Sequence, residues 1–311
     1  MKKLLKLILF ILSFCCFIII LCFLLPDPFK RAYQRAIVIQ YDYYKNIEGN
    51  KIVFVGNSSL SFGFDLDMME KLTGKQCVIL GNHAGYGMSF VMQMSKSNLQ
   101  QGDIVVLELV SNTIDYCGAE LLLTGIGHHY DMYRFFIPEV RRKVISSYPS
   151  YLEKVLMYNF SSGYSASGSY SMDSYDYRGN MIYDRPECTI PDPYTEEVAK
   201  IYGYARFTGE DYDSEFVKYV NNYIQYCDEH GIKVYITIPC YYDKALISSD
   251  ADMEAFDNTL QRTFNAPVIS KQADYIFERK YIYNAIAHCN TEGAKLRTEL
   301  IYKDMVKAGA L

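Results

Sequence analysis

The chain has 311 residues, of which 50% are hydrophobic and 22% are charged, and its formal net charge is −5 at pH 7. This length and composition are typical of a protein with one generous core, or at most two small ones. The negative charge excludes a nucleic-acid partner, because such a partner needs a basic face on the protein.

Residues 7–25 form an apolar run without a single charged side chain. As an α-helix, this run is about 30 Å long, which matches the hydrocarbon core of a bilayer. It is longer than the apolar part of a signal peptide, and no small-residue cleavage pattern follows it. The three lysines among the first six residues favour a cytoplasmic N-terminus. We therefore expect residues 1–30 to be a single-pass signal anchor, with the C-terminal domain outside the cytoplasm.

Residues 31–50 are predicted to form a helical or extended stalk. The α/β pattern starts at residue 51, where a β-branched run ends in Gly56, and it continues through a helix that Asp65 can cap and Gly74 can stop. The three predicted strands and the two helices between them alternate along the chain at residues 51–55, 66–73, 77–80, 88–99 and 104–110.

This alternation predicts a three-layer α/β/α sandwich with a mostly parallel central sheet, preceded by one transmembrane helix. The pattern lapses at residues 115–210, which are rich in Tyr, Ser, Gly and Pro. We interpret this lapse as a loop-rich insertion within a single domain of residues 51–311, with a separate domain as the alternative. The pattern resumes with helices and strands at residues 214–227, 233–239, 252–264, 268 and 291–305.

Ligands of parallel sheets bind at the carboxyl ends of the strands, and Ser58, Gly81 and Asn112 each follow one predicted strand. A serine on a strand-to-helix turn can present both its hydroxyl and its own backbone N–H to an acyl group. The Gly81 N–H and the Asn112 amide can donate to the same oxyanion. His288 lies in a loop before the last helix and is the candidate base, since catalytic triads are defined by space and not by sequence order.

Four short segments carry a resemblance to a known family: VFVGNSS at residues 53–59, LGNHAG at residues 80–85, GDIVVL at residues 102–107 and HCNTEGA at residues 288–294. In this order they resemble the blocks of the SGNH (GDSL-like) hydrolase superfamily. The sequence is most similar to its membrane-anchored bacterial branch, which includes teichoic-acid D-alanylation and alginate O-acetylation proteins. The resemblance covers most of residues 50–112 and 214–305.

The resemblance implies that Ser58 is the nucleophile, that Ser58, Gly81 and Asn112 are the oxyanion donors, and that His288 is the base. The superfamily usually carries an aspartate three or four residues before its histidine, whereas Asn284 stands there in this chain. An asparagine can orient an imidazole but adds no negative charge to stabilise the imidazolium. Asp274 is the alternative acid.

We thus expect an extracytoplasmic acyltransferase or esterase that acts on a cell-surface polysaccharide, with O-acetyl transfer through an acylated Ser58. The expected partners are the polysaccharide or acyl donor, the membrane, and a multi-pass membrane O-acyltransferase; no cofactor is expected. One alternative is a weakly active or inactive SGNH-like domain that binds glycan or partners such an acyltransferase. Another is a structural envelope protein unrelated to the superfamily. The 30 tyrosines fit a sugar-binding surface or a compositional habit of the genome.

Other histidines near these segments allow two interpretations. His83 follows Gly81 closely enough to be a candidate substrate contact. His128 and His129, with Asp131, suggest either a metal site or a surface loop, and the loop is favoured because adjacent histidines point in different directions. We therefore expect no metal site.

The nine cysteines include three in the predicted anchor and six beyond it. The six lack the paired close spacing of a zinc site, and their even number permits disulfide bonds without requiring them. Cys289, beside His288, is interpreted as a packing residue in preference to a nucleophile. Glu108, in the third predicted strand, fits either the site or a structural buried acid.

Overall fold

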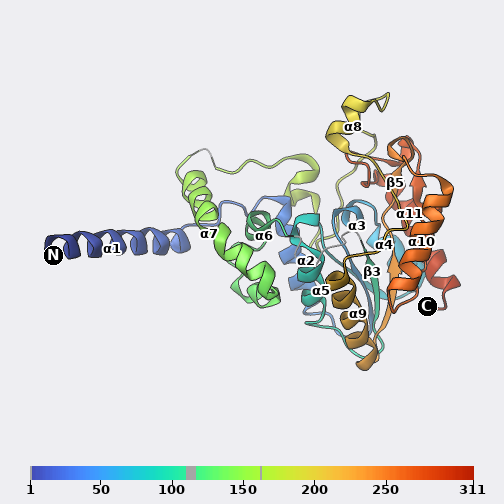
Figure 1. The fold of residues 1–311 in the computed structure, drawn as a ribbon, viewed down its shortest axis with the longest axis horizontal. Coiled ribbons are helices and arrows are strands. Elements are labelled where there is room, and N and C mark those ends of the chain that lie inside the picture. The colour runs from blue at the N-terminus through green and yellow to red at the C-terminus, as the bar shows by residue number, and fades with distance from the viewer. Residues whose placement is uncertain (1, 110–116, 162) are drawn as a thin grey trace.

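The structure is a computed structural model, and it describes residues 2–109, 117–161 and 163–311. Helix α1 (Lys2–Leu24) extends away from an α/β domain (Figure 1). The segment Lys2–Cys22 is long and apolar enough to cross a membrane, and its most apolar stretch is fully exposed. No other helix in the described ranges meets these criteria. The apolar helix predicted at the N-terminus is thus confirmed as a helix of spanning length.

The central sheet has the strand order β2-β1-β3-β4, and every neighbouring pair is parallel. All residues of β1 and β3 are buried, as expected for strands that helices cover on both faces. The predicted parallel α/β sheet is confirmed, and the carboxyl ends of its strands meet at one edge. The strands are β1 (Lys51–Val55), β2 (Gln76–Leu80), β3 (Ile104–Glu108) and β4 (Lys233–Thr237).

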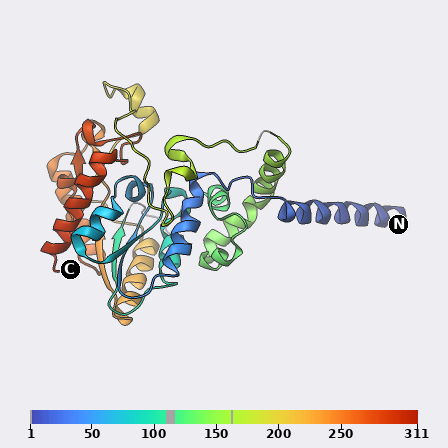
Figure 2. The ribbon, with the colours of Figure 1, turned by 180° about the vertical axis from the view of Figure 1, so that it is seen from behind.

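Helices cover both faces of the sheet (Figures 1 and 2). Three of them are connected by hydrogen bonds of Ser95. The Ser95 carbonyl accepts from the Tyr44 hydroxyl at 2.5 Å, and the Ser95 hydroxyl is hydrogen-bonded to the Tyr223 hydroxyl at 2.6 Å. Two others pack together where the Asp65 N–H donates to the Thr298 hydroxyl at 2.8 Å. The first group is α2 (Ala36–Tyr44), α5 (Met88–Ser95) and α9 (Ser214–Glu229), and the second is α4 (Leu66–Thr73) and α11 (Thr291–Lys307).

Residues 32–44 pack into the domain, and they do not form the predicted stalk. Helix α2 packs against β2, and Ala36, Ile37 and Tyr44 are fully buried. Apolar side chains lie on several sides of α2 because the sheet contacts one side and neighbouring helices contact the others. An isolated helix of this composition would expose a large apolar surface, which is unfavourable in water.

The segment predicted as a loop-rich insertion contains a packed helical pair, α6 (Ala119–Ile126) and α7 (Pro138–Asn159). Helix α7 begins with a proline in its first turn, where proline is tolerated, and it continues through Pro149. An internal proline removes one helical hydrogen bond, which explains why the sequence pattern did not indicate a helix here. The side chain of Asn159 donates to the Pro26 carbonyl at 3.0 Å, so the end of α7 lies beside the segment that follows α1.

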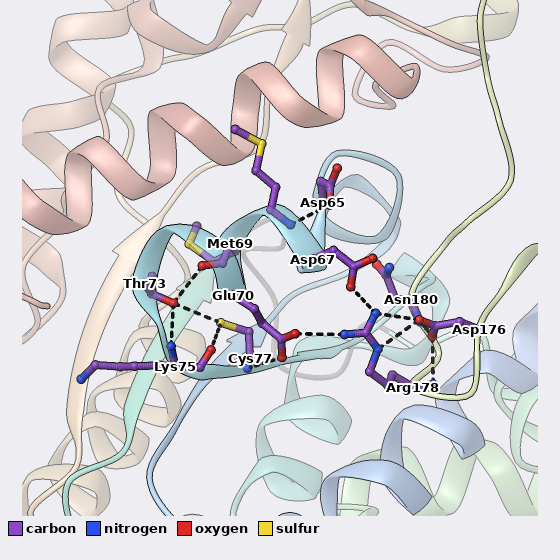
Figure 3. Close-up of polar contacts among 11 residues, drawn as sticks. Asp65, Asp67, Met69, Glu70, Thr73, Lys75, Cys77, Asp176, Arg178 and Asn180 are labelled. Atoms are coloured by element: carbon purple, nitrogen blue, oxygen red, sulfur yellow. Dashed lines mark hydrogen bonds and ion pairs between the residues drawn. The ribbon is translucent and has the colours of Figure 1, made fainter.

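The second part of the insertion is loop-rich, as predicted, and an arginine fastens it to the core (Figure 3). Arg178 lies in a turn after Asp176 and donates to the Asp67 carboxylate at 2.5 Å and to Glu70 at 3.1 Å, both on α4. It also bonds Asp176 at 2.9 Å. The Arg178 side chain is only 9% exposed, so these charge-assisted bonds hold the turn against the sheet domain.

The last third of the chain completes the fold near β4. The strand predicted near residue 268 is reduced to a single parallel bridge between Ile236 and Val268. The remaining helices and strands are α3 (Ser58–Phe62), α8 (Glu196–Tyr202), β5 (Tyr241–Tyr242), α10 (Asp250–Thr263) and β6 (Ile276–Phe277). The short 3-10 helices include η1 (Tyr33–Arg35), η2 (Ala84–Tyr86), η3 (Tyr130–Phe135), η4 (Gly168–Tyr170), η5 (Met172–Ser174), η6 (Asp243–Ala245), η7 (Gln272–Tyr275) and η8 (Arg279–Tyr281).

Candidate active site

The loop after β1 places Ser58 at the first position of the short helix α3. Asn57 caps this helix, because its side-chain oxygen accepts from the Ser59 N–H at 2.8 Å. The loop after β2 approaches closely: a side chain at Gly81 would lie 2.0 Å from the Gly56 carbonyl oxygen, and its φ is +125°. Only glycine fits there, so the two glycines bring the ends of β1 and β2 together.

Ser58 and His288 form a hydrogen-bonded pair although they are far apart in sequence. The Ser58 Oγ is 3.0 Å from His288 Nε2, and both side chains are partly exposed. His288 Nδ1 is 2.9 Å from the side-chain oxygen of Asn284, and the Asn284 amide donates to the Tyr170 hydroxyl at 2.8 Å. The structure therefore brings together a hydroxyl, an imidazole and an orienting amide in the order that serine-dependent acyl transfer requires.

The Asn284 amide also selects the tautomer of the imidazole. Because its N–H₂ donates to Tyr170, its oxygen faces His288 and accepts the Nδ1 proton. The lone pair of Nε2 is then directed at the Ser58 hydroxyl. An asparagine turned the other way would donate to Nδ1 and place the proton on Nε2, where it could not accept from serine.

The His288 ring is held by stacking as well as by hydrogen bonds. Phe62, one turn after Ser58 on α3, lies parallel to it with ring centroids 4.2 Å apart and an interplanar angle of 5°. The turn that carries His288 is closed by a bond from the Tyr283 N–H to the His288 carbonyl at 2.8 Å. Gly293 is needed below this turn, since a side chain there would meet the Tyr281 carbonyl oxygen at 2.0 Å.

The surroundings of His288 favour its neutral form. Burial lowers its pKa from 6.5 to about 3, and the nearby His83 and Arg185 act in the same direction. Arg185 contacts the back of the site, because its guanidinium lies 5.6 Å from the Phe62 ring centroid and donates to the Phe62 carbonyl at 3.2 Å. A neutral imidazole is the form that can accept the Ser58 proton.

Of the three predicted oxyanion donors, the Ser58 N–H has the expected position in the first turn of α3, where no intrahelical acceptor exists. The prediction for the Gly81 N–H is corrected, because it donates to the side-chain oxygen of the buried Gln40 at 2.9 Å. Gln40 belongs to α2, which was not expected to reach the sheet. Asn112 lies outside the described residues.

His83 lies beside the Ser58–His288 pair, close enough to influence the His288 pKa. Its Nδ1 accepts from the Gly85 N–H at 2.8 Å, and its ring lies 5.9 Å from that of Tyr33. Burial lowers the pKa of His83, so it too favours the neutral state. The predicted place of His83 at the edge of the site agrees with this position, while its role as a substrate contact stays a prediction.

A fully buried ion pair supports the site from below. Glu108, at the end of β3, is paired with Arg297 on α11, and the side chains of both residues are inaccessible to solvent. The other Glu108 oxygen accepts from the Ser59 hydroxyl at 2.5 Å, and Arg297 donates to the Ser59 carbonyl at 2.9 Å. Glu108 is thus a structural buried acid that fixes the residue next to Ser58.

The remaining candidates lie apart from this constellation. Asp274 lies in η7, and Asn284 occupies the position beside His288 Nδ1. His128 is stacked on Tyr130 in the insertion, and the described residues contain no group of three His, Cys, Asp or Glu side chains that could hold a metal ion.

The contributors to the site that were not predicted from the sequence include Phe62, Tyr170, Arg185 and Gln40. An aromatic residue four positions after a candidate nucleophile on a helix would have indicated Phe62, since residues i and i+4 share a helix face. Tyr170 sits in the Tyr/Ser-rich part of the insertion, where one tyrosine cannot be told from its neighbours. Gln40 carries no signal in the sequence.

No protein-family model and no curated protein matches this chain.

Proposed function

We propose that the protein is a serine-dependent esterase or acyltransferase in which Ser58 is the nucleophile and His288 the general base. The observation that carries the proposal is the 3.0 Å contact between Ser58 Oγ and His288 Nε2, with Asn284 on the other ring nitrogen. A histidine with a purely structural role would not need to contact a serine. Here the histidine contacts Ser58, which is partly exposed at the carboxyl edge of the parallel sheet. The SGNH-like order of the sequence segments supports the same assignment.

In the first half-reaction, Ser58 Oγ attacks the acyl carbonyl carbon and passes its proton to His288 Nε2. The Ser58 N–H donates to the oxyanion of the tetrahedral intermediate. The intermediate collapses to an acyl-serine as the C–O bond to the leaving group breaks, and the leaving group takes the proton from Nε2. In the second half-reaction, His288 Nε2 removes a proton from water or an acceptor hydroxyl, whose oxygen attacks the acyl carbon. The second tetrahedral intermediate collapses as the bond between the acyl carbon and Ser58 Oγ breaks, and His288 Nε2 returns the proton to Ser58 Oγ.

Asn284 sets the rate of this cycle. Replacement of the triad aspartate by asparagine in serine proteases lowers turnover by about 10⁴-fold, because the imidazole adopts the wrong tautomer. In this chain the amide oxygen faces His288, so the correct tautomer is retained and only the charge is missing. We therefore expect slow but measurable turnover.

The anchor makes an envelope polysaccharide the proposed acyl acceptor. A helix of spanning length keeps the domain near a bilayer, and the N-terminal lysines favour a cytoplasmic start and an extracytoplasmic domain. An acetyl ester is the proposed acyl group by analogy with the SGNH superfamily. A multi-pass membrane O-acyltransferase is the proposed partner that supplies it.

The test is active-site labelling of the full chain in detergent micelles with a fluorophosphonate probe, together with hydrolysis of an aryl acetate. We expect labelling at Ser58 and an initial burst of aryl alcohol from the acyl-serine. Ser58→Ala should abolish both signals, and Ser165→Ala, at an exposed serine of the insertion, should abolish neither. Equal hydrolysis by the Ser58→Ala and wild-type proteins would refute the proposal.

A second function is favoured by Asn284 and by the low pKa of His288. A site without a carboxylate stabilises an imidazolium poorly, which fits a domain that binds glycan without turning it over. In that case the probe leaves Ser58 unmodified while the protein binds envelope glycan in isothermal titration. Labelling at Ser58 decides against it.

A further inference from the structure

We propose that Cys240 and Cys289 form a disulfide bond that ties the His288 turn to the end of β4. Their sulfur atoms lie 3.0 Å apart, and both side chains are fully buried. They are the one pair of cysteines with sulfur atoms in contact in the described part of the chain, and as thiols they share an S–H···S hydrogen bond.

The backbone near both cysteines is held in place by hydrogen bonds. The Tyr242 N–H, two residues after Cys240, donates to the Ile286 carbonyl at 2.8 Å. Cys289 forms an antiparallel bridge with Ile282 on the other side. An S–S bond is about 2.05 Å long, so the sulfur atoms need to approach by about 1 Å, which small side-chain rotations can provide.

The two thiols differ in reactivity. The hydrogen bond from Cys289 lowers the pKa of the Cys240 thiol, and the positive charge of Arg297 acts in the same direction. Burial raises the pKa of Cys289. In the folded arrangement Cys240 is therefore the thiol that loses its proton more readily, and a thiolate is the nucleophile in exchange.

The oxidant is a disulfide-containing thiol compound or protein, which reacts while the chain folds and both sulfurs are accessible. The Cys240 thiolate attacks one sulfur of this disulfide, a mixed disulfide forms, and one thiol leaves. The Cys289 thiolate then attacks the Cys240 sulfur and releases the second thiol. Two cysteine thiols lose two electrons and two protons, and the oxidant gains both as it becomes two thiols.

The bond acts on the proposed catalytic base. Cys289 is the residue after His288, and Cys240 is joined through Pro239 to the end of β4. A covalent link between them fixes the His288 turn relative to the sheet that carries Ser58. This positioning role rests on the proposed function, and the oxidising compartment rests on the proposed extracytoplasmic location.

The test counts free thiols in the full chain by intact mass, independently of activity. The detergent-solubilised protein is unfolded in urea and refolded overnight in glutathione buffers of increasing disulfide content, and it is then denatured in N-ethylmaleimide and weighed. We expect seven of the nine cysteines to be alkylated after oxidation and all nine after dithiothreitol. Peptide mapping should find the Cys240–Cys289 cross-link. Nine alkylated cysteines in the most oxidising buffer, or a cross-link between other cysteines, would overturn the proposal.

Variants separate this pair from the other cysteines. The Cys240→Ala/Cys289→Ala protein should show seven alkylated cysteines with or without reductant. The Cys77→Ala protein, which lacks a buried cysteine outside the pair, should still lose two thiols on oxidation. Because the bond closes a long loop, oxidation should raise the Tm of the wild-type protein by about 10 °C and leave the Tm of the double variant unchanged.

Activity supplies the remaining readout. If the bond positions His288, the oxidised wild-type protein should exceed the reduced protein in kcat, with a smaller change in KM, and the Ser58→Ala protein should form the bond without activity. A Cys240–Cys289 cross-link in a wild-type protein without activity would support the proposed disulfide and refute the proposed esterase activity. Activity in a protein that still has nine free thiols after the most oxidising buffer would support the esterase and refute the disulfide.

Discussion

The α/β core and the segment inserted into it contribute to the same site by different means. The core supplies Ser58 and His288 from elements whose strand and helix patterns are local, and these elements pack through a continuous buried interior. The insertion supplies Tyr170 and Arg185 from loops, which contact the core through single polar or aromatic side chains. The core therefore determines which chemistry the site can perform. The insertion adjusts the orientation of the Asn284 amide and the His288 ring.

The largest expected effect tests the core. Arg297→Met leaves Glu108 buried without a counter-charge, so the free energy of unfolding should fall by about 3–5 kcal/mol. Urea denaturation of the full chain in detergent measures this loss. Arg262→Met breaks an exposed ion pair with Asp211 and should cost less than about 1 kcal/mol. Equal losses in the two variants would contradict the supporting role of the buried pair.

The next prediction tests the insertion alone. Arg178→Met removes the bonds to Asp67 and Glu70 and should lower local stability by about 1–3 kcal/mol. Hydrogen exchange should quicken in residues 163–185, while the amides of β1 and β3 stay protected. Arg142→Met, at an exposed arginine of α7, serves as the control. Faster exchange throughout the sheet would show that residues 163–185 unfold together with the sheet.

Asn284→Asp tests the chemistry assigned to the core. A carboxylate bonds an imidazolium more strongly than an amide does, by roughly 1.4 kcal/mol, so turnover should rise about tenfold. In the wild-type protein the lowered pKa of His288 keeps the base neutral well below pH 6.5, so activity should persist as the pH falls to about 5. The new carboxylate raises this pKa, so the acidic limb of the pH profile should move to higher pH. An unchanged limb would contradict the contact with Nδ1.

The smallest expected effect tests the hydrogen bond between Tyr170 of the insertion and Asn284 of the core. Tyr170→Phe removes the acceptor that orients the Asn284 amide, and turnover should fall about 2–10-fold. Tyr177→Phe, at an exposed tyrosine of the insertion, should have no effect. In the Asn284→Asp background the Tyr170 effect should disappear, because a carboxylate has no amide to orient. Persistence of the loss there would assign Tyr170 a merely structural role.

The sequence predicts the sheet and the loop that carries Ser58 because both depend on local patterns. The strands at 51–55 and 104–108 are rich in β-branched residues and are buried throughout, and Gly56 and Gly81 mark the turns after β1 and β2. The pairing of Ser58 with His288 was predicted as a candidate, and the structure brings the two side chains within hydrogen-bond distance.

The remainder could not be predicted because it depends on contacts between distant segments. Gln40 reaches Gly81 only because α2 packs on β2, and nothing local in residues 31–50 separates a stalk from a core helix. The buried position of Arg297 on α11 was also not predicted: it lies on the same helix as the buried Ile301 and Met305 and pairs with Glu108. A charged side chain can be predicted to lie on a buried helix face only when its oppositely charged partner is known.

The packing of α2 leaves very little free chain between the anchor and the domain. Helix α1 ends at Leu24 and Phe29 is already buried, so the intervening residues reach at most about 18 Å when fully extended. Helix α7 shortens this tether further through Asn159 and Pro26. If α1 spans a bilayer, the domain diffuses with the lipid as a nearly rigid body. Its encounters with other membrane-bound molecules then become a two-dimensional search, and a molecule released from the membrane would soon pass out of its reach.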